Sequence, residues 1–259
     1  MLQRSPLQIQ LAVINALLTR ELRTRFGAYR LGYLWVILQP LLQILIFSAI
    51  YAFGDRTLIG GLALPVFLAT GIAPFLYFKK VVSQSLSAVS ANRNLFIYRQ
   101  VRVFDAFLVR FLLEMVITFV VLLILLSGAW WLGFEVQLVN TLTFLKAYLL
   151  LSFLSFGLGL MFGVFNTLYP EPGKFIPTVL QPLMFVSGTF FSINDMPSAA
   201  QDILAWNPIL HAIELMRSAF SQGYDVSLVS FEYLGICTLI AMTLGMLTFR
   251  AKWREMLKK

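Results

Sequence analysis

The feature that most constrains this chain is a run of apolar residues, 31–53, without a single charged side chain. A helix of about 20 apolar residues crosses the hydrocarbon core of a bilayer and satisfies its backbone polar groups internally. The rest of the sequence agrees, because 59% of the 259 residues are hydrophobic and 12% are charged, against roughly a quarter charged in soluble domains. We therefore expect an all-α membrane protein.

Six segments are apolar enough to be membrane-spanning helices. They are residues 31–53, 62–78, 111–134, 147–169, 175–193 and 233–250, and we expect them to form one transmembrane domain over residues 31–259. The second and the sixth are short against the roughly 20 residues that a span needs. The polar segment 194–230 separates the last two spans and is expected to be re-entrant.

Lysine and arginine set the orientation of such a chain, because they are retained on the cytoplasmic side. With both termini inside, all but three of the 20 lysines and arginines are cytoplasmic; the exceptions are Arg56, Lys146 and Arg217. The formal net charge of +8 then reflects topology and contact with anionic membrane lipid, and we expect no nucleic-acid partner. Segment 194–230 should lie on the outer face.

Residues 6–28, most of the N-terminal segment 1–30, are expected to form an amphipathic cytoplasmic helix. Its apolar residues recur at spacings of three and four, with polar residues off that face: Leu7, Leu11, Ile14, Leu18 and Leu22. Such a helix lies in the membrane interface. The alternative is a cytosolic helix that packs on a partner.

The first span has a polar face, on which Trp35, Gln39 and Gln43 recur every four residues. Because unpaired amides are costly in lipid, this face should turn toward protein or toward a wet cavity. The sequence does not distinguish between a face that packs on protein and a face that lines a wet cavity.

A short apolar and aromatic patch interrupts the basic cytoplasmic segment 79–110. It consists of Asn94, Leu95, Phe96, Ile97, Tyr98 and Arg99. Apolar side chains framed by charges are typical of a docking surface for a soluble partner. The alternative is a lipid-facing interfacial turn.

Residues 206–223, WNPILHAIELMRSAFSQG, form a polar stretch in an otherwise apolar chain. Asn207-Pro208 is typical of a helix start. His211, Glu214 and Arg217 then fall on shared or adjacent helix faces. We expect these three side chains to satisfy one another in a structural gate at the outer face, not in a catalytic site.

Several chemistries are excluded by what the sequence lacks. It has no G-x-x-x-x-G-K-[ST] loop for nucleotide phosphates, and one histidine and one cysteine cannot build a common zinc or copper site. We expect no catalytic, cofactor or metal site in this chain. Energy for any uphill transport must then come from another subunit.

Three features together resemble the membrane subunit of ABC-2-type exporters, in the branch that exports polysaccharides. They are the N-terminal helix that runs into RFGAYRLGYLWVILQP, the six-span layout, and NPILHAIELMRSAFSQG before the last span. The resemblance covers the whole chain. It implies a homodimer around a conduit, two copies of a cytosolic ABC ATPase that bind ATP and Mg²⁺, and periplasmic or outer-membrane export partners.

The implied location is the inner membrane of a bacterium, and the implied cargo is a lipid-linked capsular polysaccharide. The resemblance matches the family's gate helix to residues 7–28, its coupling helix to the segment around 91–102, and its outer re-entrant helices to 195–223. The outer gate then comprises Asn207, Pro208, His211, Glu214 and Arg217.

A sugar chain needs aromatic faces and neutral hydrogen-bonding groups, and the candidate conduit residues are of that kind: Tyr33, Trp35, Gln39, Gln43, Tyr51, Phe75 and Tyr77. A basic cytoplasmic mouth would attract an anionic glycan, and it comprises Arg25, Arg30, Lys79 and Lys80. Positive-inside topology alone is the competing explanation for these charges.

Other functions stay open at this point. An ABC-2 permease could instead export O-antigen, teichoic acid, a lipid or a drug. A membrane-embedded glycan transferase needs clustered acidic, histidine or arginine residues, and only His211, Glu214 and Arg217 qualify. A purely structural membrane anchor leaves the cytoplasmic patch and the outer polar helix without a purpose.

Overall fold

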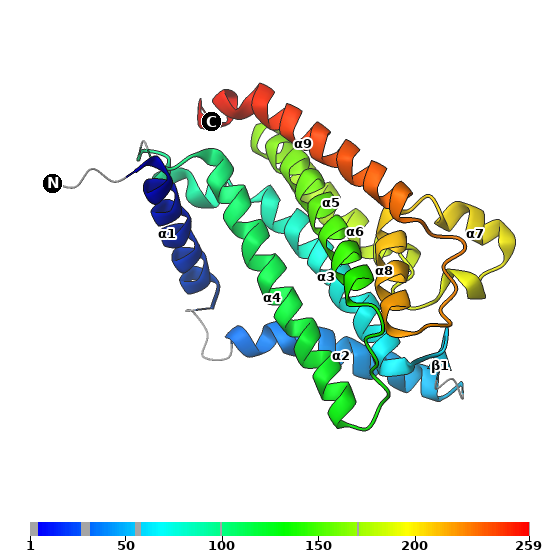
Figure 1. Cartoon of the computed structure of the whole chain (residues 1–259). Helices are drawn as coiled ribbons and strands as arrows, with labels where there is room; N and C mark the ends of the chain where they lie inside the picture. Colours follow the sequence, from blue (N-terminus) through cyan, green and yellow to red (C-terminus); the bar gives the residue numbers. More distant parts are fainter. Residues whose placement is uncertain (1–4, 27–31, 55–57, 99, 170, 259) are drawn as a thin grey trace.

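The computed structural model describes residues 5–26, 32–54, 58–98, 100–169 and 171–258, and at positions 25, 26, 32 and 33 it describes the backbone alone. Apart from one small hairpin, these residues form helices and their connections (Figure 1). Five of the described helices are long and apolar enough to cross a membrane: α2 (Gly32–Ala52), α3 (Leu64–Leu86), α4 (Val103–Trp131), α5 (Thr141–Leu168) and α9 (Phe231–Lys258). The expected all-α membrane architecture is confirmed.

Helix α3 forms the centre of the bundle. From Leu64 to Phe78 it carries no charged side chain, which is typical of a helix surrounded by other helices, and 83% of its most apolar stretch is buried. It packs against α2, α4, α5 and α8. The corresponding stretch of α2 is only 11% buried, so most of the α2 surface is available to lipid or to another protein.

Helices α5 and α9 make the most extensive helix–helix contact in the described chain. Gly157 of α5 allows this approach, because a Cβ atom on it would lie 2.6 Å from the backbone of Ala241 and Met242. Gly245 of α9 faces Gly157 from the other side. Small residues at a helix interface let backbones pack closely inside a membrane.

A two-stranded antiparallel hairpin precedes α3. Its strands are β1 (Leu58–Ile59) and β2 (Leu62–Ala63), with Ile59 paired to Leu62. The turn residues Gly60 and Gly61 have φ angles of 58° and 75°. Two consecutive positive φ values are typical of a type I′ turn, which glycine adopts without steric cost.

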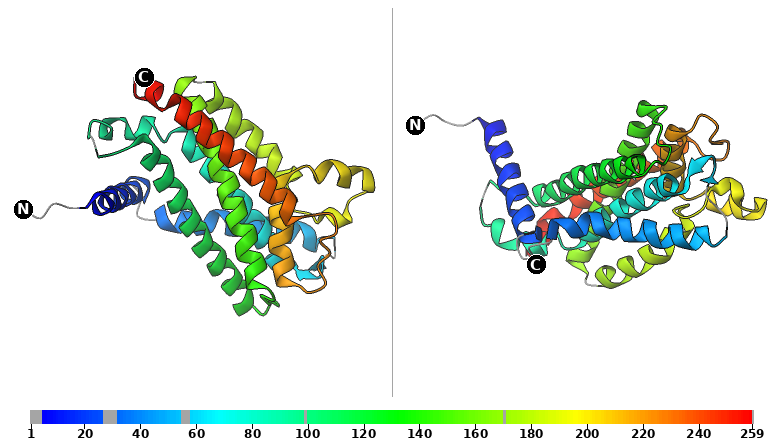
Figure 2. Two further views of the ribbon diagram at one scale, coloured as in Figure 1. Left: turned by 45° about the horizontal axis from the view of Figure 1, so that its top comes forward. Right: turned by 90° about the horizontal axis from the view of Figure 1, so that it is seen from below.

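The segment between α5 and α9 holds shorter elements. They are α6 (Pro172–Val186), the 3-10 turn η2 (Ile193–Asp195), α7 (Ser198–Leu204), α8 (Pro208–Arg217) and the 3-10 turn η3 (Ser218–Phe220). Figure 2 shows α7 projecting beyond the bundle. By contrast, α8 packs against α3, α5 and α9, and its residues from Ile209 to Arg217 are all buried.

The fifth expected span, residues 175–193, is wrong in its extent. Helix α6 ends at Val186 and has 15 residues, a length of about 22 Å, whereas the hydrocarbon core is about 30 Å thick. The chain leaves the helix at Ser187 and turns at Gly188, where φ is 68°. The apolar residues after Val186 therefore belong to a packed turn and not to a continuous spanning helix.

Four other helices extend beyond the expected spans, and one of them, α5, begins at Thr141 instead of 147. Helix α3 continues from 78 to Leu86, α4 begins at Val103 instead of 111, and α9 continues from 250 to Lys258. Hydropathy marks where a helix leaves the hydrocarbon, whereas the backbone hydrogen bonds of the helix continue past that boundary. Lys79 and Lys80 accordingly lie inside α3 and not in a loop.

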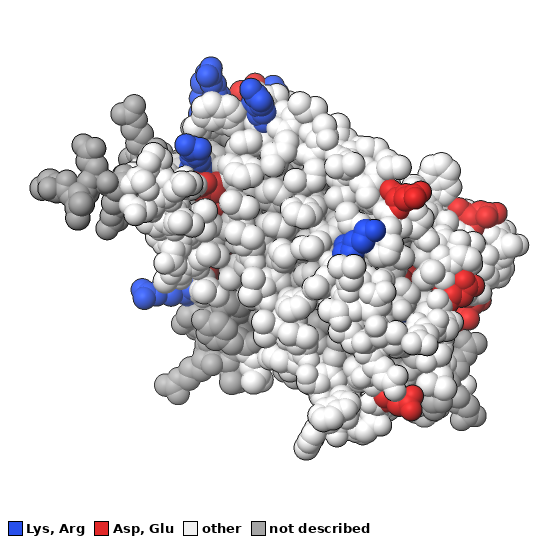
Figure 3. All heavy atoms as spheres, viewed as in Figure 1, with Lys and Arg blue, Asp and Glu red and all other residues white. Residues whose placement is uncertain are grey.

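The two ends of the bundle differ in charge. Figure 3 shows lysine and arginine side chains where α9 finishes, and acidic side chains around the end that carries α7. Helix α1 (Pro6–Phe26) lies across the basic end (Figure 1), where it contacts the 3-10 helix η1 (Ser90–Leu95). This asymmetry is the pattern that the positive-inside rule describes.

Candidate functional site

Glu214 and Arg217 form a buried ion pair near the acidic end of the bundle. Arg217 Nη1 lies 3.0 Å from Glu214 Oε1, and neither side chain is exposed. The pair projects from α8, whose first turn contains Pro208. Asn207 caps this helix by accepting a hydrogen bond from the Ile209 N–H at 3.0 Å. The expected helix start at Asn207-Pro208 is confirmed.

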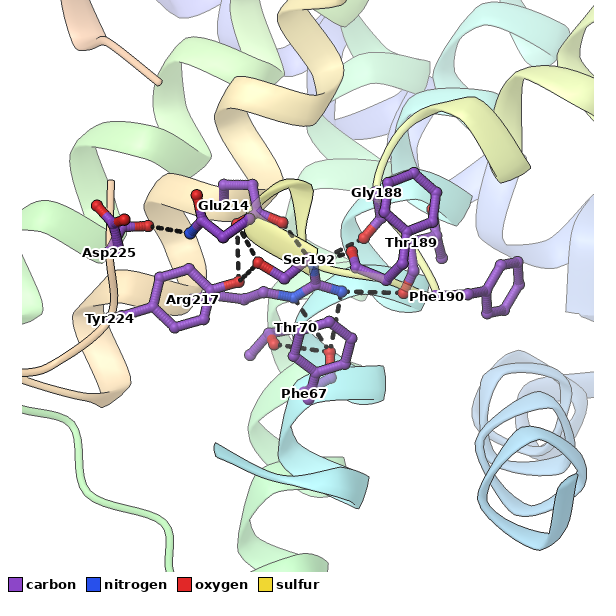
Figure 4. A network of polar contacts seen from close by, with 12 residues as sticks. Phe67, Thr70, Gly188, Thr189, Phe190, Ser192, Glu214, Arg217, Tyr224 and Asp225 are labelled. Atoms are coloured by element: carbon purple, nitrogen blue, oxygen red, sulfur yellow. Dashed lines mark hydrogen bonds and ion pairs between the residues drawn. The ribbon is translucent and has the colours of Figure 1, made fainter. Parts of the chain in front are cut away.

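Arg217 binds carbonyl groups of two other segments (Figure 4). Its Nη1 donates to the carbonyls of Gly188 at 2.7 Å and Phe191 at 3.2 Å. Its Nη2 donates to those of Thr189 at 2.9 Å and Phe67 at 3.3 Å. The guanidinium carbon also lies 3.5 Å from the centroid of the Phe67 ring. The planar guanidinium group, with several N–H donors in a fixed arrangement that lysine lacks, therefore joins α8 to α3 and to the turn after α6.

The other oxygen of the Glu214 carboxylate is also engaged. Tyr224 donates its hydroxyl to Oε2 at 2.7 Å, and Ser192 Oγ donates to the same oxygen at 3.4 Å. Burial raises the pKa of the Glu214 carboxyl, while Arg217 and the Tyr224 hydroxyl act in the opposite direction. Burial also raises the pKa of Tyr224, which keeps its hydroxyl protonated and able to donate.

We call this set of side chains and carbonyls the Arg217 cluster: Phe67, Gly188, Thr189, Phe191, Ser192, Glu214, Arg217 and Tyr224. Apart from the Thr189 hydroxyl, which is buried without a hydrogen-bond partner among the described residues, its polar groups are satisfied by one another in a water-poor interior, where hydrogen bonds are strong and unpaired groups are costly. The cluster joins three segments of chain, and its arrangement is that of a structural network.

Gly71 of α3 makes room for the Arg217 cluster. A Cβ atom on Gly71 would lie 2.5 Å from the Thr189 carbonyl oxygen and would also overlap the Arg217 guanidinium. Phe67 and Arg217 are 150 residues apart in the sequence. The sequence interpretation missed Gly71, Phe67 and Tyr224, because no local pattern links them to α8.

His211 does not join the cluster, so the expected mutual contact of His211, Glu214 and Arg217 is wrong for the histidine. Its Nε2 lies 2.7 Å from the Ala205 carbonyl oxygen, and its Nδ1 accepts the Ser230 N–H at 3.0 Å. Burial lowers the pKa of His211, and a neutral ring protonated on Nε2 fits both bonds. His211 therefore joins the start of α8 to the start of α9.

At the basic end, Arg20 of α1 donates to the Ala91 carbonyl at 3.1 Å, and three contacts between side chains also join α1 to the bundle. Each links a side chain of α1 to a distant one: Gln10 Nε2 to Asp105 Oδ1 at 2.7 Å, Arg20 Nη1 to Asn92 Oδ1 at 2.6 Å, and Glu21 Oε1 to Arg110 Nε at 2.9 Å. Two residues of the expected apolar face, Leu7 and Leu11, are 77% and 66% exposed. The helix packs on its own chain through these polar groups and through the buried Leu17. It leaves Leu7 and Leu11 available to lipid, which fits an interfacial helix.

The cytoplasmic patch, residues 94–99, begins two residues after Asn92, which binds Arg20 of α1. Ile97 and Tyr98 are 85% and 64% exposed, Asn94 is exposed, and Leu95 and Phe96 are half-buried. Arg99 lies outside the described residues. The exposed pair offers an aliphatic and an aromatic side chain on a turn, the kind of surface that binds a partner.

The candidate conduit residues lie in two different environments. Phe75 and Tyr77 of α3 are fully buried in the bundle, because α3 is surrounded by other helices, so they line no surface in this structure. Trp35 of α2 is 62% exposed, and Gln39 and Gln43 are half-buried on the same helix.

Tyr51, near the end of α2, donates its hydroxyl to the Phe190 carbonyl. Lys79 and Lys80, two candidates for the basic mouth, are half-buried on α3. The side chains of Arg25, Arg30 and Tyr33 lie outside the described part of the chain. Within the part that is described, no group of three or more His, Cys, Asp and Glu side chains could hold a metal ion.

Comparison with known proteins agrees with this architecture. The ABC-2 type transporter family matches residues 12–221. The chain is 37% identical to the polysialic acid transport protein KpsM of Escherichia coli over 254 residues, 98% of each chain. It is 28% identical to the capsule polysaccharide export inner-membrane protein BexB of Haemophilus influenzae, over 94% of this chain and 92% of the other.

A more distant relative is the O-antigen export system permease protein RfbA of Klebsiella pneumoniae, 21% identical over 84% of this chain and 82% of the other. The match to the family covers most of the sequence, and the identity to KpsM extends over almost all of it. This chain belongs to the ABC-2 type transporter family.

Proposed function

We propose that this chain is the membrane-spanning permease of an ATP-driven exporter that moves a lipid-linked capsular polysaccharide outward across the bacterial inner membrane. The observation that carries the proposal is the similarity, over almost the full length, to relatives named for polysialic acid transport and for capsule polysaccharide export. The similarity to an O-antigen permease is weaker and covers less of the chain, which favours a capsular cargo over O-antigen.

The ATPase is proposed to be a separate cytosolic chain, present in two copies, that binds ATP and Mg²⁺. This chain has no nucleotide-binding loop of the common type. The proposed docking surface is the cytoplasmic patch, with Ile97 and Tyr98 as its exposed side chains. An exposed aromatic side chain beside an aliphatic one is a common anchor of protein interfaces.

The contacts of α1 offer a path by which the ATPase could move the permease. Asn92 lies two residues before the patch and binds Arg20 of α1, and Arg110 of α4 binds Glu21 of the same helix. A force on the patch would therefore act on α1 and α4 together. This arrangement supports the assignment of α1 as the gate helix.

Two copies of the chain are proposed to enclose the conduit between their α2 faces. Trp35 is largely exposed on this helix, and only 11% of the most apolar stretch of α2 is buried. A second copy or the glycan would cover this surface. Phe75 and Tyr77, enclosed in the bundle, would not touch the glycan in this conformation.

The Arg217 cluster is proposed to hold the elements of the outer gate in fixed positions. Both termini of the chain are proposed to lie in the cytoplasm. The cluster fixes α8 against Phe67 near the start of α3 and against the turn after α6. Acidic side chains gather at the end of the bundle that carries α7 (Figure 3). Periplasmic and outer-membrane export proteins would receive the glycan from this end.

The coupling assignment is tested with the double variant Ile97→Ala/Tyr98→Ala. Both side chains are exposed, so we expect the protein to fold, but loss of an aromatic anchor should weaken ATPase binding by about 2 kcal/mol, roughly 30-fold in Kd. The measurements are the affinity for the co-encoded ATPase and the capsule at the cell surface. Leu58→Ala, at a site 64% exposed in β1, is the control, and normal export by the double variant would contradict the assignment.

The cargo is tested separately. The chain is purified with its co-encoded ATPase in lipid nanodiscs, and hydrolysis is measured with a lipid-linked capsular glycan or with a lipid-linked O-antigen. We expect only the capsular glycan to raise the rate. Stimulation by O-antigen alone would contradict the capsular cargo and indicate an O-antigen exporter. It would not affect the assignment of the chain to its family.

A further inference from the structure

The proposal above assigns no ligand to a cavity at the basic end of the bundle. Its volume is about 910 Å³, and it is bounded by α1, the turn after η1, the start of α4 and the end of α9. Cavities that hold small molecules have volumes of roughly 300–1,000 Å³. This cavity is therefore large enough for part of an organic ligand.

The deeper wall of the cavity is apolar. Phe104 and Leu108 of α4 and Met246 and Phe249 of α9 line it, and the rings of Phe104 and Phe249 pack edge to face with their centroids 5.5 Å apart. Both helices are among those long and apolar enough to cross a membrane. Met246 and Phe249 lie in the apolar span 233–250, whereas Phe104 and Leu108 precede the apolar span that begins at residue 111. The apolar wall therefore lies where these helices leave the hydrocarbon, at a depth that a lipid reaches from the bilayer.

The rim of the cavity is cationic. Arg102 and Arg250 line it and are exposed, and within the described part of the chain no hydrogen bond or ion pair engages either guanidinium. The acid of the cavity, Asp105, is already satisfied: Gln10 donates to Oδ1 at 2.7 Å and the Arg102 N–H donates to Oδ2 at 2.9 Å. The rim thus offers positive charge directly beside the apolar wall.

We propose that this cavity binds one phospholipid with an anionic headgroup from the surrounding bilayer. The phosphate interacts with Arg102 and Arg250, and an acyl chain lies along the apolar wall. Charge complementarity selects an anionic headgroup, since basic residues near a membrane surface attract anionic lipid. A lipid fits this site better than a soluble protein does, because Met246 and Phe249 of the wall belong to the membrane-spanning stretch of α9.

The bound lipid would also contact the cytoplasmic patch. Phe96 and Tyr98 line the same cavity, together with Gln10 and Ile14 of α1. A lipid in this place therefore packs between the proposed ATPase-docking turn and the proposed gate helix. The binding site itself follows from the cavity and does not depend on the cargo of the exporter.

The test compares binding of phosphatidylglycerol and phosphatidylcholine with identical acyl chains to the full chain, purified in a neutral detergent, by native mass spectrometry. We expect the wild type to prefer phosphatidylglycerol. Each arginine near a membrane surface contributes about fivefold to such a preference, so Arg102→Gln/Arg250→Gln should lower it roughly 25-fold. Lys258→Gln removes a charge from the same end of α9 outside the cavity lining and should change it less than about twofold.

The apolar half of the site is tested with Met246→Trp, which fills the cavity and leaves both arginines in place. We expect it to reduce binding of both lipids, with correct folding checked by gel filtration. The proposal is wrong if the double arginine variant keeps the preference, if Lys258→Gln loses it equally, or if Met246→Trp binds lipid like the wild type. It is equally wrong if these variants weaken binding of the ATPase chain and leave lipid binding intact.

Discussion

At the scale of single residues, the burial of Arg217 determines how much its charge contributes to the stability of the protein. The Glu214–Arg217 pair is fully buried, whereas Lys252 and Glu255 form a pair with the same three-residue spacing whose side chains are 45% and 52% exposed. A buried charge that loses its partner has no water to compensate it, but an exposed one does. The two pairs thus compare ion pairs of the same spacing at different burial.

Replacing Arg217 by methionine should destabilise the protein by about 3–5 kcal/mol, because the Glu214 carboxylate would remain buried without its cation. Lys252→Met should cost less than about 1 kcal/mol. Thermal unfolding of the purified protein in detergent measures both effects. The double variant Glu214→Leu/Arg217→Met should recover part of the loss, since it removes both charges; equal melting temperatures for Arg217→Met and Lys252→Met would contradict the argument.

At the scale of elements, the α5–α9 contact shows how side-chain size sets the distance between two helices. The backbones meet at Gly157 and Gly245. Apolar burial alone does not drive helices together inside a membrane, because lipid is equally apolar, so close van der Waals packing contributes a large share of the association. The position of α9 therefore depends on the absence of side chains at this crossing.

The variant Gly157→Leu should force α5 and α9 apart, because its Cβ would lie 2.6 Å from the backbone of α9. We expect a loss of about 1–3 kcal/mol or more in stability. Gly128→Leu is the control in α4, where a Cβ would meet nothing within 4 Å, and it should be within about 1 kcal/mol of the wild type or slightly more stable. Thermal unfolding in detergent distinguishes the two variants. Equal melting temperatures would show that the stability of the protein does not depend on close packing at the α5–α9 crossing.

At the scale of the whole molecule, charge and fold together assign a direction to the bundle. Basic residues gather at the end that holds the C-terminal turn of α9, and acidic residues gather around α7 (Figure 3). The positive-inside rule then predicts that the C-terminus is cytoplasmic and that α7 is outside. The Arg217 cluster and the cytoplasmic patch would accordingly lie on opposite sides of the membrane.

Single cysteines test this orientation after the native Cys237 is replaced by alanine. A membrane-impermeant maleimide applied to intact spheroplasts should label Asp202→Cys in α7 but not Lys258→Cys in α9, because only the first is expected outside. Both sites should react once the membrane is permeabilised. Labelling of Lys258→Cys in intact spheroplasts would reverse the assignment.

Much of this architecture was predictable because its signals are local in the sequence. Apolar runs place α2, α3, α4, α5 and α9, since hydrocarbon selects composition over any stretch of about 20 residues. Asn207-Pro208 marks the start of α8 through the geometry of those two residues. The exposed pair Ile97 and Tyr98 stands out by its contrast with the charges around it.

Only the tertiary structure decided which distant groups meet. The sequence alone established a helical membrane protein with a basic and an acidic side, and it marked residues 206–223 as unusual. It did not show that Arg217 binds carbonyls of α3 and of the turn after α6, that His211 joins α9 instead, that α6 is short, or that Phe75 and Tyr77 are enclosed. The physical reason is that hydropathy and helix capping depend on neighbours in the chain, whereas a buried hydrogen bond depends on groups as many as 150 residues apart.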